Sequence, residues 1–252
     1  MDYDRLKMLP FSELKAMAEE MELDKQRSTQ GYIDVITQAF QLYEEYRKDK
    51  IDRYTKIEQL GEKGKEGVVY FVRDNHENRD CAMKCFRKGK SSATLKKEAQ
   101  LQSQASKAGI SPDIYDYDTV CRKYIVMEKM DNNLFNLLKK RKGKLSETHQ
   151  KQMVAIFQKL DEIGIFHGDS SPLNFMIKGK KLYIIDYGFA KPINTALIKK
   201  YNSKSLNMKF MITGFILKMR EIVPDVRYEY LEQYMPKEDR KRFGLKDTNI
   251  KH

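Results

Sequence analysis

Two acidic residues and one amide in the second half of the chain have the types and spacing to support phosphoryl transfer. Asp169 and Asn174 lie five residues apart, and Asp186 follows a short apolar stretch and precedes Tyr187-Gly188. A carboxylate beside an attacking hydroxyl can accept its proton, and carboxylate and amide oxygens are ligands that Mg²⁺ prefers. These three side chains therefore predict a site for metal-dependent chemistry on a phosphorylated compound.

A simpler interpretation is two polar turns beside an ordinary hairpin of residues 176–185. An isolated HxD triplet would favour that interpretation. Here Pro172 lies between Asp169 and Asn174, and the second strand ends in Asp-Tyr-Gly, so we favour the catalytic interpretation.

A glycine-rich turn between two short strands precedes this region. Residues 54–60 alternate in polarity, and Gly61–Gly67 is followed by the apolar residues 68–72. Glycines let backbone N–H groups approach phosphate oxygens closely. Lys84 lies seventeen residues beyond Gly67 in an apolar stretch, where its ammonium needs either water or an anion. An edge lysine that reaches solvent is the alternative, but the glycine-rich turn favours a phosphate ligand.

The elements after Lys84 supply its predicted partner and the scaffold. Residues 92–108 predict a helix in which Glu98 is the sole acidic residue between Asp80 and Asp113. We therefore pair Glu98 with Lys84, rather than with neighbouring lysines in solvent. The remaining predicted elements are strands at 113–117 and 124–130, a short helix at 131–140, a helix capped by Ser146 with an apolar stripe at Met153, Ala155, Ile156, Phe157, Leu160 and Ile163, and an apolar helix at 206–219.

The order HxDxxxxN, strand, DxG resembles the eukaryotic-like serine/threonine protein kinase superfamily over about residues 51–200. The triplet HGD and the short C-terminal part are similar to the small atypical kinases of the KEOPS complex and the RIO family. A compact kinase joined to a SAP-like module, a small helical unit that residues 1–50 resemble, would suit a large DNA virus. The resemblance implies an α+β, two-lobed protein-kinase-like fold. Its expected parts are an N-terminal helical extension (1–50), a small antiparallel-sheet N-lobe with the hinge (51–130) and a reduced, mostly helical C-lobe (131–252).

The resemblance also implies ATP and Mg²⁺ as cofactors and a protein serine or threonine as acceptor. Asp169 and Lys84 would be catalytic, and Asn174 and Asp186 would bind the metal. Met127 would be the gatekeeper, and His167 would pack beneath the Asp-Tyr-Gly turn without a role in proton transfer. The nucleotide-binding residues implied are Leu60, Gly61, Gly64, Gly67, Val69, Ala82, Lys84, Glu98, Met127, and Glu128 and Met130 of the hinge.

Several features depart from the family pattern. Gly61 lies one residue too early for the first glycine of GxGxxGxV, and no APE-like string follows the Asp-Tyr-Gly turn. Gly168 replaces an arginine, so we expect activity, including autophosphorylation, without activation-loop regulation. Ser171 stands where serine/threonine kinases usually have lysine. An ATPase-like subunit of a complex remains an alternative, as does a pseudokinase or nucleic-acid-binding scaffold, although a scaffold has no need of the full set of polar residues.

Residues 1–50 predict two helices separated by a polar break at 24–31. Leu14, Leu23 and Gly31 make the segment similar to the SAP module, a small helical DNA-binding unit. Its net charge is −3, while the rest of the chain carries +15. Because an acidic segment suits phosphate contacts poorly, we prefer a helical appendage that packs on the catalytic body. The basic body favours phosphorylated ligands, acidic proteins or nucleic acid as partners.

The overall composition indicates an intracellular protein. No apolar run approaches the ~20 residues that span a bilayer, and the first residues lack the pattern of a secretory signal. Three cysteines offer no paired disulfide framework, and Cys81 and Cys85 are two ligands against the four of a structural zinc site. We expect a cytoplasmic or nuclear protein that is not secreted and has no membrane partner.

Overall fold

The computed structural model describes residues 6–87, 89–119, 122–224 and 226–244. Contacts divide the chain into two compact units. One consists of Met1–Thr55 and Arg73–Arg79, and the other of Lys56–Val72 and Asp80–His252. Residues 245–252 lie outside the described part.

The first unit contains the predicted helix pair. Helix α2 (Phe11–Glu20) and helix α3 (Thr29–Asp52) pack through a small apolar cluster that includes Leu14 and Ile36. The rings of Phe11 and Tyr32 meet edge to face, 5.2 Å apart. Helix α3 continues well beyond the apolar pattern, and the residues that follow include Glu44, Glu45 and Lys48, which are exposed and favour helix. DNA binding by this segment stays a prediction.

Buried Asp74 organises the second part of this unit. Its carboxylate accepts two hydrogen bonds from the Arg53 guanidinium, at 3.0 and 3.2 Å, and others from the backbone N–H groups of His76 and Glu77. Burial opposes ionisation, but the Arg53 guanidinium and these N–H groups hold the pKa of Asp74 below its usual range. The charged Asp74 side chain thereby holds the turn that follows β2.

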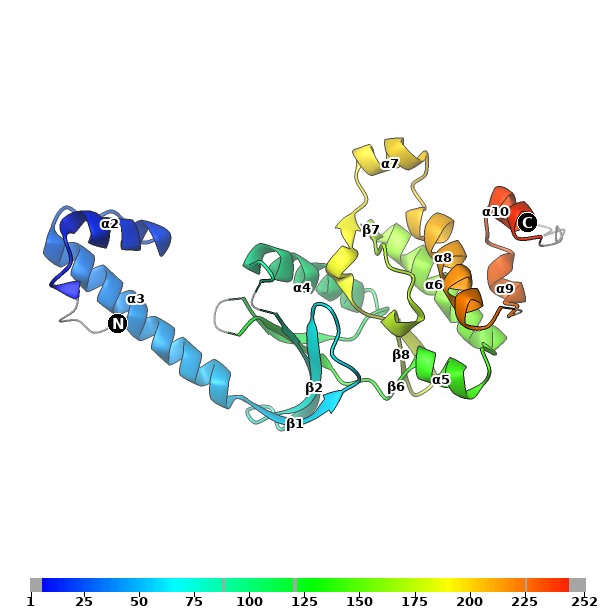
Figure 1. Ribbon diagram of the computed structural model, residues 1–252, viewed down its shortest axis with the longest axis horizontal. Helices are drawn as coiled ribbons and strands as arrows, with labels where there is room; N and C mark the ends of the chain where they lie inside the picture. The colour runs from blue at the N-terminus through cyan, green and yellow to red at the C-terminus, as the bar shows by residue number, and fades with distance from the viewer. Residues whose placement is uncertain (1–5, 88, 120–121, 225, 245–252) are drawn as a thin grey trace. The chain divides into compact units, whose positions relative to one another are not determined.

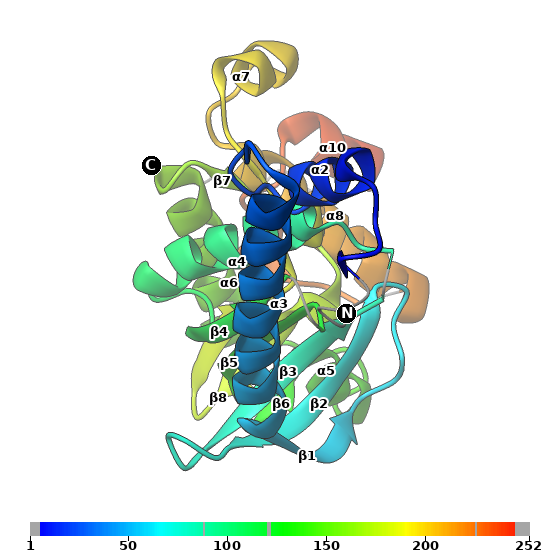
Figure 2. The ribbon, with the colours of Figure 1, turned by 90° about the vertical axis from the view of Figure 1, so that its left-hand side faces the viewer.

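The N-lobe is a five-stranded sheet with one helix. Figure 2 shows its strands, in the order β1 (Tyr54–Leu60), β2 (Gly67–Asp74), β3 (Arg79–Phe86), β5 (Tyr124–Glu128) and β4 (Ile114–Asp118). Strand β5 pairs antiparallel with β3 and β4. Helix α4 (Ser92–Lys107) begins at Ser91, whose hydroxyl accepts from the N–H of Thr94, and buries Leu95 and Ala99.

The C-lobe is mostly helical and holds the larger core. Its helices are α5 (Leu134–Lys140), α6 (Glu147–Glu162), α7 (Thr195–Tyr201), α8 (Leu206–Ile222), α9 (Glu229–Glu232) and α10 (Lys237–Arg242). Helices α6 and α8 lie side by side, and α7 projects away from them (Figures 1 and 2). Ser146 caps α6 as predicted. The buried face of α6 differs from the predicted apolar stripe at one place: Val154 is buried, while Ala155 is exposed.

Short strands frame the loops that carry the acidic residues. Strands β6 (Asn132–Asn133), β8 (Phe175–Lys178) and β9 (Lys181–Ile184) form one sheet, and β7 (Ile165–Phe166) pairs with β10 (Lys191–Pro192). Helix α5 starts later than predicted, at Leu134, because Asn132 and Asn133 pair with β8 and the Asn133 side chain caps the helix. The chain thus has the expected two-lobed, kinase-like α+β fold. Among the described residues, no helix is long and apolar enough to span a membrane.

Candidate active site

The Lys84 ammonium lies between two carboxylates that come from different elements. Lys84 is on β3, where it pairs with Ile125 of β5, so the antiparallel ladder fixes its position. Its Nζ is 2.7 Å from Glu98 Oε1 of α4 and 2.8 Å from Asp186 Oδ1. The Lys84–Glu98 pair expected from the sequence is present, and Asp186 lies on the same ammonium.

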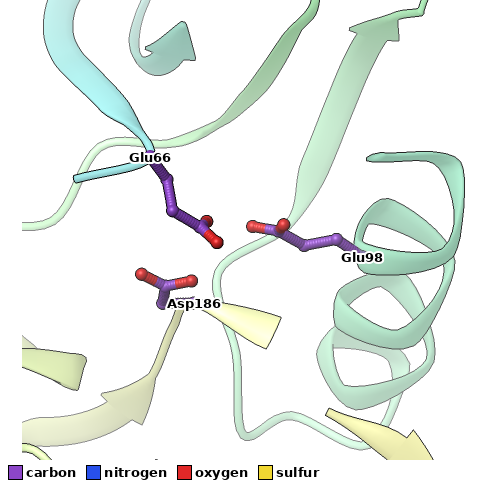
Figure 3. A group of neighbouring side chains, drawn as sticks. All are labelled: Glu66, Glu98 and Asp186. Atoms are coloured by element: carbon purple, nitrogen blue, oxygen red, sulfur yellow. The ribbon is translucent and has the colours of Figure 1, made fainter. Parts of the chain in front are cut away.

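Two further residues complete this ion network. Glu66, in the glycine-rich turn, lies 3.5 Å from Lys84 Nζ and 2.9 Å from Lys90 Nζ. Lys90 also bonds Glu98, at 2.5 Å. Figure 3 shows the three carboxylates of Glu66, Glu98 and Asp186 converging. One oxygen of each lies within 4.8 Å of those of the other two. Two ammonium groups therefore balance most of the charge of three carboxylates.

These pairs keep both ends of the network ionised at neutral pH. Burial opposes the charged form of Asp186, but the Lys84 ammonium holds the pKa of that carboxyl below its usual range. Burial likewise opposes the charge of Lys84, but the carboxylates of Asp186 and Glu98 raise the pKa of that ammonium above its usual value. A buried, permanently charged lysine is suited to bind an anion.

Asp169 and Asn174 form a second group on the loop between β7 and β8. Asn174 Nδ2 donates to Asp169 Oδ2 at 2.9 Å, and the N–H of Ser171 donates to Asp169 Oδ1 at 3.1 Å. Lys218 of α8 bonds the same Oδ1 at 2.7 Å. Burial opposes ionisation of Asp169, but the hydrogen bonds from Lys218 and Asn174 hold its pKa below its usual range.

His167 connects the two groups through the backbone. Its Nε2 lies 3.1 Å from the carbonyl oxygen of Ile185, and its Nδ1 accepts from the N–H of Asp169 at 3.4 Å. These contacts require the neutral ring with the proton on Nε2. The ring meets Tyr187 edge to face at 4.9 Å. His167 is thus fully buried beneath the Asp-Tyr-Gly turn, where the resemblance placed it.

The Asp-Tyr-Gly turn is fixed on its other side by Ser111. The hydroxyls of Ser111 and Tyr187 are 2.5 Å apart, and Ser111 Oγ donates to the carbonyl of Ile184 at 2.6 Å. Because Ser111 has one hydroxyl proton, Tyr187 is the donor of the pair. Asp186 adopts a left-handed backbone conformation with φ of 69°. The turn that presents Asp186 is therefore held by contacts on both sides.

Four of the predicted apolar nucleotide-binding residues lie in one cluster of the N-lobe. The buried members include Ala82 and Met127, and Leu60 and Val69 pack against them. Met127 also receives a hydrogen bond from Gln102 on its sulfur. Sequence positions from β1, β2, β3 and β5 are thus brought together on one side of the sheet, which fits an apolar wall for a base.

The predicted glycine and hinge residues differ in their structural roles. A Cβ on Gly67 would lie 1.9 Å from the carbonyl oxygen of Cys85, so that glycine is required by the close approach of β2 and β3. The N–H of Gly64 donates to the carbonyl of Gly67, whereas a Cβ on Gly61 would meet nothing within 4 Å. In the hinge, Glu128 donates its N–H to Asp113 and its carboxylate pairs with Lys178, while Met130 is buried.

Several residues of the site escaped the sequence interpretation. Glu66 lies in the glycine-rich turn and Lys90 follows the strand of Lys84, but nothing in the sequence indicated that both belong to one ion network. Asn207, at the start of α8, accepts from the N–H of His167 at 3.0 Å. Lys218 is on the same helix and has no motif around it. The one available signal was Ser171, which left Asp169 without the usual nearby lysine.

The donor set fits a magnesium ion at Asn174 and Asp186. The amide nitrogen of Asn174 is used by Asp169, which directs its oxygen away from that carboxylate. Asp186 uses Oδ1 for Lys84 and for the N–H of Gly188. Within the described residues, this leaves the Asn174 amide oxygen and the second Asp186 carboxylate oxygen, which are hard ligands of the kind that Mg²⁺ takes.

Comparison with known proteins gives a consistent family assignment. A model of the protein kinase domain matches residues 54–213, more than half of the chain. Cell division control protein 2 homolog 3 of Trypanosoma brucei brucei is 28% identical over 155 residues, which are 57% of this chain and 49% of that protein. A probable serine/threonine-protein kinase BUD32 homolog of Archaeoglobus fulgidus is 29% identical over 96 residues, covering 38% and 45%.

A probable serine/threonine-protein kinase of fowlpox virus is 35% identical over 74 residues, which are 28% of this chain and 25% of that protein. The chain spans half or less of the length of each of these relatives. The matched range contains the ion network on Lys84 as well as Asp169, Asn174 and Asp186. On this basis the chain belongs to the protein kinase domain family.

Proposed function

We propose that this chain is a protein kinase that transfers the γ-phosphoryl group of MgATP to serine or threonine hydroxyls, including its own. The observation that supports the proposal most strongly is the Lys84 ammonium, which bonds both Glu98 and Asp186. Kinase activity needs the lysine–glutamate pair and the metal-binding aspartate in place at the same time. The relatives whose names include serine/threonine-protein kinase support the choice of acceptor.

The chain's own residues would divide the work as follows. Lys84 and the N–H groups of the glycine-rich turn bind the phosphates, and the apolar cluster around Met127 accepts the base. Asn174 and Asp186 would hold Mg²⁺, which when bound neutralises charge on the phosphates. Asp169 orients the acceptor hydroxyl and takes its proton.

In the transfer step the acceptor oxygen forms a bond to the γ-phosphorus. The bond from that phosphorus to the β–γ bridging oxygen breaks, ADP leaves, and the hydroxyl proton passes to the Asp169 carboxylate. The lowered pKa of Asp169 keeps it ionised at neutral pH, so it is ready to accept the proton. Positioning and fixed charges supply most of the rate enhancement, since no covalent intermediate is needed.

We also propose that activity does not depend on a phosphorylated activation loop. Gly168 stands where a phosphate-reading arginine would be, and it has a φ of 80° that side chains rarely adopt. A Cβ there would also lie 3.3 Å from the carbonyl oxygen of Phe189. Phosphatase treatment should therefore leave the rate unchanged, and loss of turnover would contradict this part of the proposal.

The test is transfer of label from [γ-³²P]ATP to acidic and basic protein acceptors, with the parent and Asp186→Asn compared. We expect labelled acceptor and labelled kinase with the parent, and neither with Asp186→Asn. Phosphoamino-acid analysis identifies the hydroxyl. ATP hydrolysis without any phosphoprotein would favour an ATPase-like subunit, and absence of both reactions would favour a scaffold.

A further inference from the structure

Asp169 has one charged partner among the described residues, and it comes from an unexpected element. In the described part of the chain, its carboxylate bonds the N–H of Ser171, the amide of Asn174 and the ammonium of Lys218. Lys218 lies on α8, far from Asp169 in the sequence, and not on the loop that carries Asp169. A cation is thus present at the site although Ser171 occupies the loop position where related kinases usually have lysine.

Helix α8 is held against this loop at two further places. At its start, Asn207 accepts from the N–H of His167 and donates to the carbonyl of Ile165 at 2.7 Å. In its middle, Gly214 approaches the loop so closely that a Cβ would lie 2.4 Å from Ser170 Oγ. Lys218 follows Gly214 by four residues, so both lie on the same face of the helix. The contact between Lys218 and Asp169 is therefore part of a close helix-to-loop interface.

The start of α8 is itself anchored to α6, an earlier helix of the same lobe. Asp161 of α6 accepts from the backbone N–H groups of Asn207 and Met208, at 2.8 and 3.1 Å. A carboxylate at this end also complements the partial positive charge of the helix terminus. These contacts fix where α8 lies, and with it the backbone position of Lys218.

We propose that Lys218 is a positioning residue for phosphoryl transfer: from α8 it orients Asp169 and supplies the positive charge that Ser171 does not. An ammonium has three N–H donors, and Asp169 uses one of them. The Lys218 and Asp169 side chains are 42% and 25% exposed, so the pair remains open to solvent. The inference rests on the proposed kinase function and deepens it.

The competing interpretation is an ordinary surface ion pair, which contributes little. A positioning role and a surface pair differ in what they affect. Loss of a positioning charge lowers kcat, because the acceptor side is disturbed while the ATP-binding groups keep their partners. Loss of a surface pair leaves kcat unchanged.

The experiment compares the full chain with Lys218→Met, Lys218→Arg and the relocation variant Ser171→Lys/Lys218→Met. Lys209→Met is the matched control, because Lys209 is on the same helix but bonds the carbonyl of Tyr201 at 2.8 Å. For each variant we would measure kcat and KM for ATP with a protein acceptor, the Kd for MgATP and the melting temperature. Lys218→Gln replaces Lys218→Met if the methionine lowers the melting temperature.

We expect Lys218→Met to lower kcat roughly ten- to hundred-fold, with KM and Kd for ATP nearly unchanged. Lys218→Arg should retain most of kcat, Lys209→Met should match the parent, and the relocated lysine should restore much of the lost rate.

Two results would overturn the inference, and they can be told apart. If the parent transfers phosphoryl groups and Lys218→Met keeps the same kcat, Lys218 is a surface residue while the proposed function stands. If the parent transfers none to any acceptor, the proposed function and the inference fail together. A loss of rate that the relocated lysine does not restore at all would also contradict the positioning role.

Discussion

The two sides of the candidate site are built differently. On the nucleotide side, Lys84 and Glu98 are 12% and 2% exposed and come from a strand and a helix of the N-lobe. On the acceptor side, Asp169 and Lys218 are 25% and 42% exposed and come from a loop and a helix of the C-lobe. Ion pairs in the buried group depend on each other far more, because an unpaired buried charge is costly.

We infer from this difference that one side binds the nucleotide and the other serves phosphoryl transfer. In the proposed mechanism, the buried network fixes the charges that bind a triphosphate before any acceptor arrives. The more open group leaves room for an acceptor hydroxyl beside Asp169. His167 joins the two sides, since its ring bonds the backbone of both Asp169 and Ile185. Substitutions on the two sides should therefore affect different kinetic constants.

The largest effect is expected from Lys84→Met, which removes the ammonium shared by Glu98 and Asp186. We predict that kcat/KM for ATP falls by roughly 10²–10³-fold, as for loss of a fixed charge at a reacting group. The measurement is initial-rate phosphorylation of a protein acceptor. Lys56→Met is the control, since Lys56 is exposed on β1 and lies over the Tyr70 ring. A rate equal to the parent's would contradict the assignment of Lys84.

A second prediction concerns the stability of the buried side. Glu98→Gln leaves the ammonium groups of Lys84 and Lys90 with a neutral partner, and disrupting a buried pair costs about 3 kcal/mol. For a chain of this size we expect the melting temperature to fall by roughly 10 °C. Glu147→Gln breaks an exposed pair with Lys151 and should change it little. Equal melting temperatures for the two variants would show that the buried network does not stabilise the fold.

The third prediction tests the residue that joins the two sides. Burial lowers the pKa of His167 below its usual range, so the folded state holds the neutral ring. Stability from this group is present above the unfolded pKa of about 6.5 and is lost as pH falls below it, at up to about 1.4 kcal/mol per pH unit. Urea unfolding of the parent between about pH 7 and 5 should show this slope. His167→Gln should flatten it, and an unchanged slope would contradict the burial of a neutral ring.

The smallest effect is expected at the edge of the network. Glu66 is 40% exposed, and its carboxylate lies on the two lysines to which phosphates would bind. Glu66→Gln should tighten MgATP binding by roughly two- to five-fold, because a competing anion is removed. Fluorescence titration measures the change. Weaker binding would instead assign Glu66 a favourable contact with the nucleotide complex.

The nucleotide side was predictable because regular secondary structure fixes its residues. A lysine in an apolar strand needs an anion, and Glu98 was the one acid on the next helix, so elimination gave the pair. Spacing also gave the hairpin that ends in Asp186, and the family resemblance gave the structural place of His167. Apolar periodicity gave both N-terminal helices, and α3 ends at Asp52, two residues beyond the predicted segment.

The acceptor side was only half predictable. The spacing of Asp169 and Asn174 predicted that the two residues act together. Lys218 lies 49 residues beyond Asp169, on a helix that was predicted from its apolar pattern. No local rule states which face of α8 meets the loop. That contact depends on Gly214 and Asn207, whose importance appears only when the helix is packed. The same limit applies to Glu66, which reaches the network across a turn.

The most direct test of this division uses Asp169→Asn, with MgATP affinity and single-turnover phosphoryl transfer measured on the same preparation. The substitution leaves Lys84, Glu98 and Asp186 with all of their mutual contacts. We predict an unchanged Kd for MgATP and a transfer rate lower by roughly 10²–10⁴-fold, as expected for loss of a positioned base. A variant that transfers phosphoryl groups as fast as the parent would contradict the account.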